Sequence, residues 1–338
     1  MPIALDATYS LGRNLSGVGV YSREILFGLA ELHPEEEFLW CYRSHRFLRS
    51  YRDGIAKNAV RRLLVGTPPG DLFHALNQRV DARANRTVTT FHDLFVMTGD
   101  YSTPDFRARF TAQAREAAER SDAIIAVSQF TASQIEDLLK IPAERIRVVP
   151  HGVHMPEPST MPREKLVLLV GAIQRRKNVA TLVKAFAAMP QGWRLILAGA
   201  ADGYGAEAEL QAVQQSPRKH DIDVLGYVPA EQLAQLYNRA SIFAFPSLDE
   251  GFGIPVLEAM AHGIPVVTSN RSALPEVAGG AALLADPRSV EEISAALLRL
   301  AESDSLRADL AGRGRERARQ FSWRSALEKT WAVYDEVR

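Results

Sequence analysis

The stretch SIFAFPSLDEGFGIPVLEAMAHGIPVVTS, residues 241–269, predicts a fold class on its own. Residues 241–247 and 264–269 are short apolar runs, as expected of two buried strands. Between them lie a loop with two glycines and an apolar helix that begins near Pro255. A strand, a helix and a second strand at this spacing form a crossover unit, which indicates a parallel sheet in an α/β protein.

The second half of the chain continues this alternation. KLVLLVGAI, residues 165–173, is a continuous apolar run, and further strands are expected at 194–200 and 223–228. Asn178 is expected to cap a helix whose apolar residues recur at helical spacing. Those residues are Val179, Leu182, Val183 and Phe186. Other helices are expected near residues 205–216, 229–240, 289–303 and 304–320.

The first half shows the same pattern with weaker signals. A helix is expected near residues 18–32. The strand candidates are residues 3–9, 87–93, 122–128 and 145–152. Residues 153–165 contain three prolines among polar neighbours, which predicts a linker between the halves.

We therefore predict two Rossmann-like, doubly wound parallel-sheet domains, residues 1–155 and 163–320, that face a central cleft. In such sheets, ligands bind beyond the carboxyl ends of the strands. The last segment, about residues 321–338, is amphipathic and has an aromatic face that must be buried.

Composition excludes several classes of protein. The 338 residues include 40 basic and 40 acidic side chains, so no global field attracts nucleic acid. The single cysteine, Cys41, excludes an intrachain disulfide and is expected to be packed. The N-terminus lacks a secretory pattern, and no apolar run approaches the roughly 20 residues that span a bilayer. We expect a cytoplasmic protein.

Residues 43–62 are basic and partly amphipathic. They are expected either to form a solvated surface or to lie near anionic lipid or an acceptor diphosphate. The second alternative would make the protein peripheral on the inner face of a membrane.

Two glutamates flank the start of the helix in the quoted stretch. Glu250 follows the strand, and Glu258 lies about one turn inside the helix. Gly251 and Gly253 allow close approach of a ligand, and the helix N-terminus suits a phosphate or a sugar oxygen. Helical spacing separates the two carboxylates by about 12 Å, whereas a glycosidase pair needs about 5 to 9.5 Å. Two separate hydroxyl-binding roles are predicted, and two solvated glutamates are the alternative.

A basic cluster follows the strand at residues 165–173. Arg175, Arg176 and Lys177 could neutralise a diphosphate there, although a solvated charge run would look the same. The chain has no G-x-x-x-x-G-K-[ST] run, which excludes a P-loop triphosphatase.

Glycines also follow the first strand. Gly17 and Gly19 permit a tight turn into a helix, but Ser22 occupies the last position of a G-x-G-x-x-G pattern. A nicotinamide-binding fingerprint is therefore weak, which disfavours a dehydrogenase. A simple tight turn is the alternative to a ligand site.

His92 ends a strand candidate, where it either contacts a phosphate or sugar oxygen or is structural. His74 is expected to be structural. Asp221 and Asp223 resemble a cation-binding pair, but they precede a strand and should face away from the cleft. No Cys or His grouping has zinc spacing, so no metal site is predicted.

Taken together, these residues resemble a retaining glycosyltransferase of family 4, or glycosyl transferases group 1, with the two-domain GT-B fold. Residues 247–269 are similar to the E-x7-E segment of that family, and LPEVAGGAALLADP, 274–287, to the family's next segment. VGAIQRRKN, IIAVSQFTASQI and VVPHGV are further family pieces. The resemblance covers nearly the whole chain and is strongest from residue 165 to 290.

The resemblance implies roles for individual residues. Glu258 would bind the ribose of a nucleotide-diphosphate sugar, Glu250 its sugar, and Lys177 its diphosphate. The implied catalytic residues are Glu250, Lys177, Arg176 and His92. The implied donor contacts are Gly17, Gly19, Gly171, Gly226, Tyr227, Gly251, Phe252, Gly253, Ile254 and Glu258. The C-terminal helix would pack back onto the first domain.

One position departs from the family. Many members carry an arginine where this chain has Ala172, so the choice of phosphate ligand among Arg175, Arg176 and Lys177 stays open. The resemblance implies transfer of a hexose, with mannose as the first candidate, to a saccharide or lipid-linked glycan without a metal cofactor. A nucleotide-sugar epimerase and a non-catalytic sugar-nucleotide binding protein are the alternatives.

Overall fold

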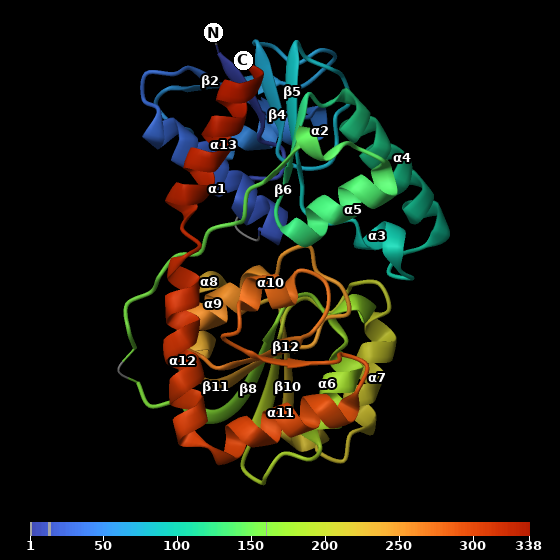
Figure 1. The fold of residues 1–338 in the computed structure, drawn as a ribbon, viewed down its shortest axis with the longest axis vertical. Coiled ribbons are helices and arrows are strands. Elements are labelled where there is room, and N and C mark those ends of the chain that lie inside the picture. Colours follow the sequence, from blue (N-terminus) through green and yellow to red (C-terminus); the bar gives the residue numbers. More distant parts are fainter. Residues whose placement is uncertain (1, 13–14, 160) are drawn as a thin grey trace. The chain divides into compact units, whose positions relative to one another are not determined.

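The computed structural model describes residues 2–12, 15–159 and 161–338. The chain divides into two compact units, one made of Met1–Gly152 with Ser322–Arg338 and the other of Val153–Phe321. Each unit is a parallel β-sheet with helices packed on its faces, as Figure 1 shows. The predicted fold class, two doubly wound α/β halves, is confirmed.

Within the described residues, the first unit contains a seven-stranded sheet. Its strands are β1 (Ile3–Asp6), β2 (Phe38–Tyr42), β3 (Ala59–Leu63), β4 (Leu72–Ala75), β5 (Arg86–Phe91), β6 (Ala123–Ala126) and β7 (Ile146–Val148). They lie in the order β3-β2-β1-β4-β5-β6-β7, and all neighbours are parallel. The strand order reverses between β1 and β4, which is where such sheets bind ligands.

Helices cover both faces of this sheet. They are α1 (Gly17–Leu32), α2 (Ser44–Phe47), α3 (Phe95–Thr98), α4 (Pro104–Arg120), α5 (Gln129–Leu139) and α13 (Trp323–Val337), with the 3-10 turns η1 (Leu48–Arg52) and η2 (Ala143–Arg145). Because side chains alternate along a strand, β1 contributes to two cores. Ile3 and Leu5 pack in the core that includes α1 and α13, whereas Ala4 packs in the core that includes α4 and α5.

The final helix, α13, belongs to the first unit and lies against α1, as Figure 1 also shows. Leu327 sits so close to Gly28 of α1 that a β-carbon there would lie 2.5 Å from its Cδ1. The hydroxyl of Tyr334 lies 2.6 Å from His74 Nδ1. The aromatic face of this helix is therefore buried, with Trp323 and Tyr334 in the core.

The second unit contains a six-stranded parallel sheet within the described residues. Its strands are β8 (Glu164–Val170), β9 (Arg194–Ala198), β10 (Ile222–Gly226), β11 (Ala240–Phe245), β12 (Val266–Ser269) and β13 (Leu283–Ala285). They lie in the order β10-β9-β8-β11-β12-β13, so the order reverses between β8 and β11.

The helices of the second unit pack on its sheet and on one another. Its helices and 3-10 turns are η3 (Arg175–Lys177), α6 (Val179–Phe186), α7 (Ala206–Gln215), η4 (Lys219–Asp221), α8 (Ala230–Arg239), α9 (Ile254–Ala261), α10 (Leu274–Ala278), α11 (Val290–Glu302) and α12 (Asp304–Arg319). Val167 and Leu169 of β8 share a core with α6, α7 and α11. Helix α9 packs against α12, where Gly314 meets Met260.

Two sequence-based expectations need correction. The predicted elements of the first unit omitted β2, β3, β4 and α4. Asn178 does not cap α6 with its side chain: its backbone is left-handed, with φ of 59°, and Nδ2 donates to Pro246 O at 3.0 Å and to Pro287 O at 2.6 Å. It ties loops together instead. Among the described residues, each helix is too short or too polar to cross a membrane.

Candidate functional site

A cluster of charged residues in the second unit lies at the carboxyl ends of two adjacent strands. β8 ends at Val170, and η3 follows it with Arg176 and Lys177. β11 ends at Phe245, and the loop that follows carries Glu250 into the start of α9. Because β8 and β11 are neighbours at the switch point, the two loops meet, although 73 residues separate Lys177 from Glu250.

Glu250 forms ion pairs with both cations, and we call these three buried residues the charge triad. Its Oε1 lies 2.6 Å from Lys177 Nζ, and its Oε2 lies 2.6 Å from Arg176 Nη1. Burial raises the pKa of Glu250, but the two cations outweigh burial and hold the pKa at about 2. The carboxylate is thus charged at neutral pH. The charge triad therefore has two positive charges and one negative charge. Arg175, the third basic residue of this segment, is exposed and is not part of the triad.

Further contacts hold the triad in place. The ammonium of Lys177 lies 4.4 Å from the centre of the Phe245 ring, a cation–π contact. Leu248 N donates to Arg176 O at 2.8 Å, and Glu250 N donates to Ser272 Oγ at 3.1 Å. The loop after β11 is therefore tied to η3 on one side and to the segment before α10 on the other.

The glycine-rich turn after Glu250 requires glycine at one position. Gly253 has φ of 105°, in the left-handed region that side chains disfavour, and it ends the loop so that α9 can begin at Ile254. Gly251 and Phe252 are buried, and the Phe252 ring packs edge-on against Phe321, with centres 5.9 Å apart. The helix N-terminus follows the triad directly, and its N–H groups favour an anion there.

Glu258 lies on α9, half-buried, and its carboxylate has a defined partner. The hydroxyl of Tyr237, a buried residue of α8, donates to Glu258 Oε2 at 2.8 Å. The Tyr237 ring also stacks on His262, with centres 4.9 Å apart. Burial raises the pKa of Glu258, and the hydrogen bond from Tyr237 opposes that rise. Tyr237 therefore both orients this carboxylate and favours its charged form.

For the nucleotide-sugar donor that the sequence resemblance implies, we expect Tyr237→Phe to raise KM about 3- to 10-fold while kcat changes less, since one hydrogen bond contributes about 1 kcal/mol. The physical reason is that Glu258 would lose the partner that orients it. Initial rates over a range of donor concentrations measure the effect. In the Glu258→Ala background the same change should add nothing, and fully additive losses would contradict the coupling.

Three glycines meet at the carboxyl ends of β8, β9 and β10. Gly199 N donates to Gly226 O at 2.8 Å, and a β-carbon at Gly199 would lie 2.0 Å from Gly171 O. Tyr227 follows Gly226 and is half exposed, 47%. The structure thus brings together two of the predicted donor contacts, Gly171 and Gly226, beside an exposed aromatic ring.

The predicted glycines of the first unit begin α1. Gly17 is exposed at the first helical position, and Gly19 lies buried in the first turn. Ser16 caps the helix by accepting from Gly19 N at 3.3 Å. A β-carbon at Gly19 would lie 2.9 Å from Tyr9 O, so this glycine allows the helix to approach the loop after β1.

His92 follows β5 and is buried among aromatic rings. Its Nε2 donates to Leu76 O at 2.9 Å, because a carbonyl can only accept. Burial lowers the pKa of His92 to about 4, with the Leu76 carbonyl opposing, so the ring is neutral at pH 7. It packs on His151, with ring centres 5.4 Å apart, and on Tyr21, at 4.7 Å. A neutral His92 can accept a proton or a hydrogen bond through Nδ1.

The residues considered for a metal site are engaged elsewhere. Asp221 pairs with Arg218 at 2.5 Å, and Asp223 pairs with Arg194 at 2.5 Å. Within residues 2–12, 15–159 and 161–338, no group of three or more His, Cys, Asp or Glu side chains could hold a metal ion.

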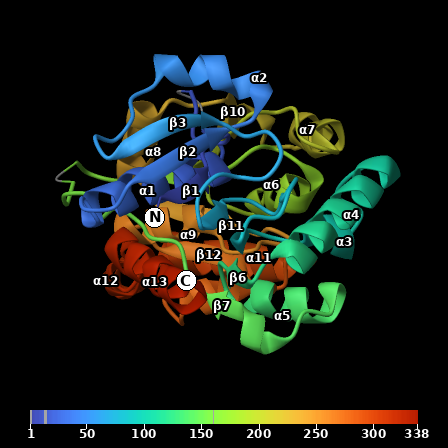
Figure 2. The same cartoon turned by 90° about the horizontal axis from the view of Figure 1, so that it is seen from above.

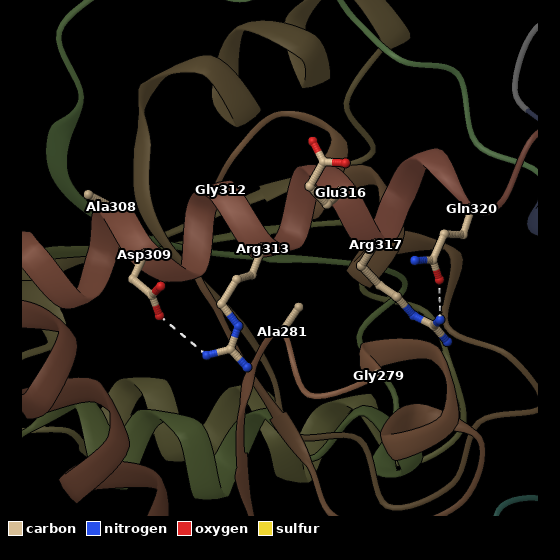
Figure 3. A pocket seen from close by; sticks show the side chains of 9 residues that line it. All are labelled: Gly279, Ala281, Ala308, Asp309, Gly312, Arg313, Glu316, Arg317 and Gln320. Carbon is tan, nitrogen blue, oxygen red and sulfur yellow. Dashed lines mark hydrogen bonds and ion pairs between the residues drawn. The ribbon is translucent and has the colours of Figure 1, made fainter.

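A pocket of about 550 Å³ lies between α12 and the turn after α10, as Figure 3 shows. Its polar side chains bond to the protein itself. Arg313 pairs with Asp309 one turn away, and Arg317 donates to Gln320 Oε1 at 2.6 Å and to Val277 O at 3.0 Å. The pocket contains none of the predicted site residues.

Three neighbours of the predicted residues were missed from the sequence. Tyr237 lies on a different helix from Glu258, and no local pattern links them. His151 lies within the VVPHGV piece, where a histidine after a strand was a usable signal. Gly199 follows β9 in LAGA, the same strand-then-glycine pattern that drew attention to Gly171.

Comparisons with known proteins agree with this arrangement. The family profile described as Glycosyltransferase Family 4 matches residues 30–155, and the one described as Glycosyl transferases group 1 matches residues 155–317. The O-antigen chain mannosyltransferase B of Escherichia coli is 36% identical in an alignment 281 residues long, which covers 78% of this chain and 74% of that protein. The serotype-specific mannosyltransferase WbdA of Escherichia coli is 27% identical over 70% of this chain, a match that spans 32% of WbdA.

A solved structure shows the same fold. Sucrose-phosphate synthase from Thermosynechococcus elongatus superposes with a TM-score of 0.78 at 21% identity, covering 99% of this chain and 98% of that one. The profiles, the relatives and the two parallel-sheet units lead to one assignment. The chain belongs to glycosyltransferase family 4, the glycosyl transferases group 1, and is a transferase with the GT-B fold.

Proposed function

We propose that this glycosyltransferase moves mannose from a nucleotide-diphosphate sugar, with GDP-mannose as the first candidate, onto a saccharide or lipid-linked glycan. Anomeric configuration would be retained, and the product would be a polysaccharide such as an O-antigen. Two relatives named as mannosyltransferases support the choice of sugar. The second unit would bind the donor, and the first unit would bind the acceptor.

The observation that carries the proposal is the charge triad at the start of α9. As the sugar–phosphate bond breaks, negative charge develops on the leaving diphosphate. Lys177, Arg176 and the N–H groups at the start of α9 would stabilise that charge. Glu250 would then accept hydrogen bonds from hydroxyls of the donor sugar, while its two cations turn to the phosphate oxygens.

Five other predicted residues have roles in the same scheme. Glu258, oriented by Tyr237, would accept from the ribose hydroxyls. Gly171 and Gly226 would let the nucleotide approach the backbone, with Tyr227 beside the base. His92, neutral and buried, would accept a hydrogen bond from a sugar hydroxyl through Nδ1.

The direct test is turnover with a defined donor. A panel of nucleotide sugars is first ranked by thermal shift, where a ligand at 100 times its Kd adds about 2.7 kcal/mol of apparent stability. The best donor is then incubated with an oligomannoside acceptor, and the product anomer is assigned by NMR. GDP-mannose is expected to give the largest shift and an α-linked product. Donor isomerisation without acceptor, or binding without any turnover, would refute the transferase mechanism proposed here.

We expect chelation to leave the reaction intact. Saturating EDTA should change the rate of mannose transfer by less than about 2-fold, because Lys177 and Arg176 supply the positive charge that a bound cation supplies elsewhere. The measurement is the initial rate after dialysis against EDTA, with and without added Mg²⁺ or Mn²⁺. Loss of activity that Mn²⁺ restores would show that a metal completes the site.

A further inference from the structure

The segment from residue 43 to 65 differs in charge from the rest of the chain. It holds seven Lys and Arg side chains and one acidic residue, although the whole chain has equal numbers of basic and acidic groups. In the structure it forms α2, η1 and the edge strand β3 of the first unit, and Figure 2 shows α2 beside β3. We call the exposed side chains of η1 the basic face. They are Leu48, Arg49, Tyr51 and Arg52.

The 3-10 geometry of η1 sorts its residues into two sides. Ser50 is buried, and Phe47, three residues earlier, packs against the core that includes α1. Leu48 and Tyr51 are also three residues apart, and they point outward with 80% and 63% exposure. Large apolar side chains at such exposure are costly in water, so this side of η1 favours contact with another surface.

Hydrogen bonds hold the backbone of this segment in a defined conformation. Ser50 Oγ donates to Phe47 O at 2.6 Å, and Arg61 Nη2 donates to Asp53 O at 2.6 Å. The Arg61 guanidinium also lies 5.1 Å from the centre of the Tyr51 ring. Leu48 and Tyr51 are therefore presented from an ordered turn that is anchored to β3.

The two arginines of the basic face are exposed cations. Within the part of the chain that the structure describes, neither Arg49 nor Arg52 forms an ion pair, and both are exposed. Protruding Leu and Tyr side chains flanked by arginines match the interface of an anionic bilayer, where apolar groups enter the headgroup layer and guanidinium groups meet phosphates. A purely polar polyanion would offer no apolar surface for Leu48 to contact.

We propose that the basic face binds the surface of an anionic phospholipid bilayer, with Leu48 and Tyr51 inserted among the headgroups. The face lies at the carboxyl end of β2, the edge of the sheet from which α1 and Gly17 also follow β1. Asp53 Oδ2, at the end of η1, accepts from Gly12 N in the loop after β1 at 3.1 Å. A bilayer at this face would present a lipid-anchored acceptor to that loop, a consequence that rests on the proposed function.

The binding test uses the full chain and vesicles of stated composition. Sedimentation with phosphatidylcholine vesicles is compared with sedimentation with vesicles that contain 30% phosphatidylglycerol. Binding is expected to the anionic vesicles and to weaken at 0.5 M NaCl. Arg49→Gln with Arg52→Gln should weaken it about 30-fold, since each basic residue near such a surface contributes about 1 kcal/mol.

Matched controls come from α4 of the same unit. Arg109→Gln with Arg115→Gln removes two exposed charges there, and Phe106→Ser removes a side chain that is 46% exposed. These variants should bind vesicles like the original chain, whereas Leu48→Ser with Tyr51→Ser should lose binding. Equal losses for both sets, or equal binding to neutral vesicles, would overturn the proposal. So would a shift to a dimer in light scattering that the Leu48 and Tyr51 changes abolish.

An activity measurement distinguishes the proposed membrane binding from the proposed glycosyltransferase function. Leu48→Ser with Tyr51→Ser should leave transfer to a water-soluble acceptor unchanged and lower transfer to an acceptor embedded in anionic vesicles at least 10-fold. Equal rates on both acceptors would refute the role of the face in delivering the acceptor. If no acceptor is glycosylated by the unchanged chain, the proposed function fails, while the vesicle sedimentation still decides whether the face binds lipid.

Discussion

Lys177→Ala is expected to lower kcat for sugar transfer by about 10²- to 10³-fold, the loss typical of removing one donor that stabilises a developing oxyanion. In the structure the Lys177 ammonium is buried, 2.6 Å from Glu250 and above the Phe245 ring. In the proposed reaction this ammonium would bind the negative charge that develops on the leaving diphosphate. Because that charge is largest in the transition state, kcat should fall more than donor affinity does.

The fold should survive this substitution at some cost. Arg176 still pairs with Glu250 through the other carboxylate oxygen, so the buried carboxylate keeps one partner. Lys184→Ala, on the exposed side of α6, removes the same side chain outside the triad and should leave kcat unchanged. Single-turnover rates and melting curves are measured for both variants. A folded Lys177→Ala protein with the original turnover would remove Lys177 from the mechanism.

The strands that the sequence predicted best are those buried on both faces. β8 and β11 read as unbroken apolar runs because helices cover the sheet on each side. The strands it missed carry mixed signals. β3 lies at the sheet edge with two arginines in a five-residue run, and β4 is four residues long with His74 in its middle. His74 is tolerated there because Thr90 and Tyr334 bond to its two ring nitrogens.

The candidate site divides in a similar way. Glu250 and Lys177 could be selected from the sequence because each follows a strand, and the ends of adjacent parallel strands meet. Their direct contact could not be predicted, since it depends on the side-chain geometry of loops 73 residues apart. Likewise, Tyr237 reaches Glu258 only because α8 and α9 lie near each other in the folded unit. The local sequence pattern predicts where a strand ends, but it does not predict which side chains form hydrogen bonds between two helices.

Glu250→Gln is expected to separate binding of the diphosphate from transfer of the sugar. The change keeps the shape of the side chain and removes the negative charge between Lys177 and Arg176. Sugar transfer should fall at least 10²-fold, because a neutral amide would replace the carboxylate that is proposed to accept hydrogen bonds from the sugar hydroxyls. Affinity for the nucleoside diphosphate alone should stay level or rise, since the phosphate oxygens no longer compete with a buried carboxylate for the two cations. This sign is opposite to that expected for Lys177→Ala.

Stability without ligand should fall in the same variant, because two buried cations lose their shared partner. The pKa of Glu250 is held at about 2, so its contribution to stability is present above the ordinary carboxyl range and is lost as the pH falls towards 2. The melting temperature of Glu250→Gln should therefore depend less on pH in that window.

Titration calorimetry with GDP and melting curves from pH 2.5 to 7 measure both effects. Glu209→Gln, a change at another buried carboxylate of the same unit, which accepts from Ala180 N, should not tighten diphosphate binding. Weaker GDP binding by Glu250→Gln than by the original chain would mean that Glu250 organises Lys177 and Arg176 for the diphosphate. It would then not be a group that the diphosphate displaces.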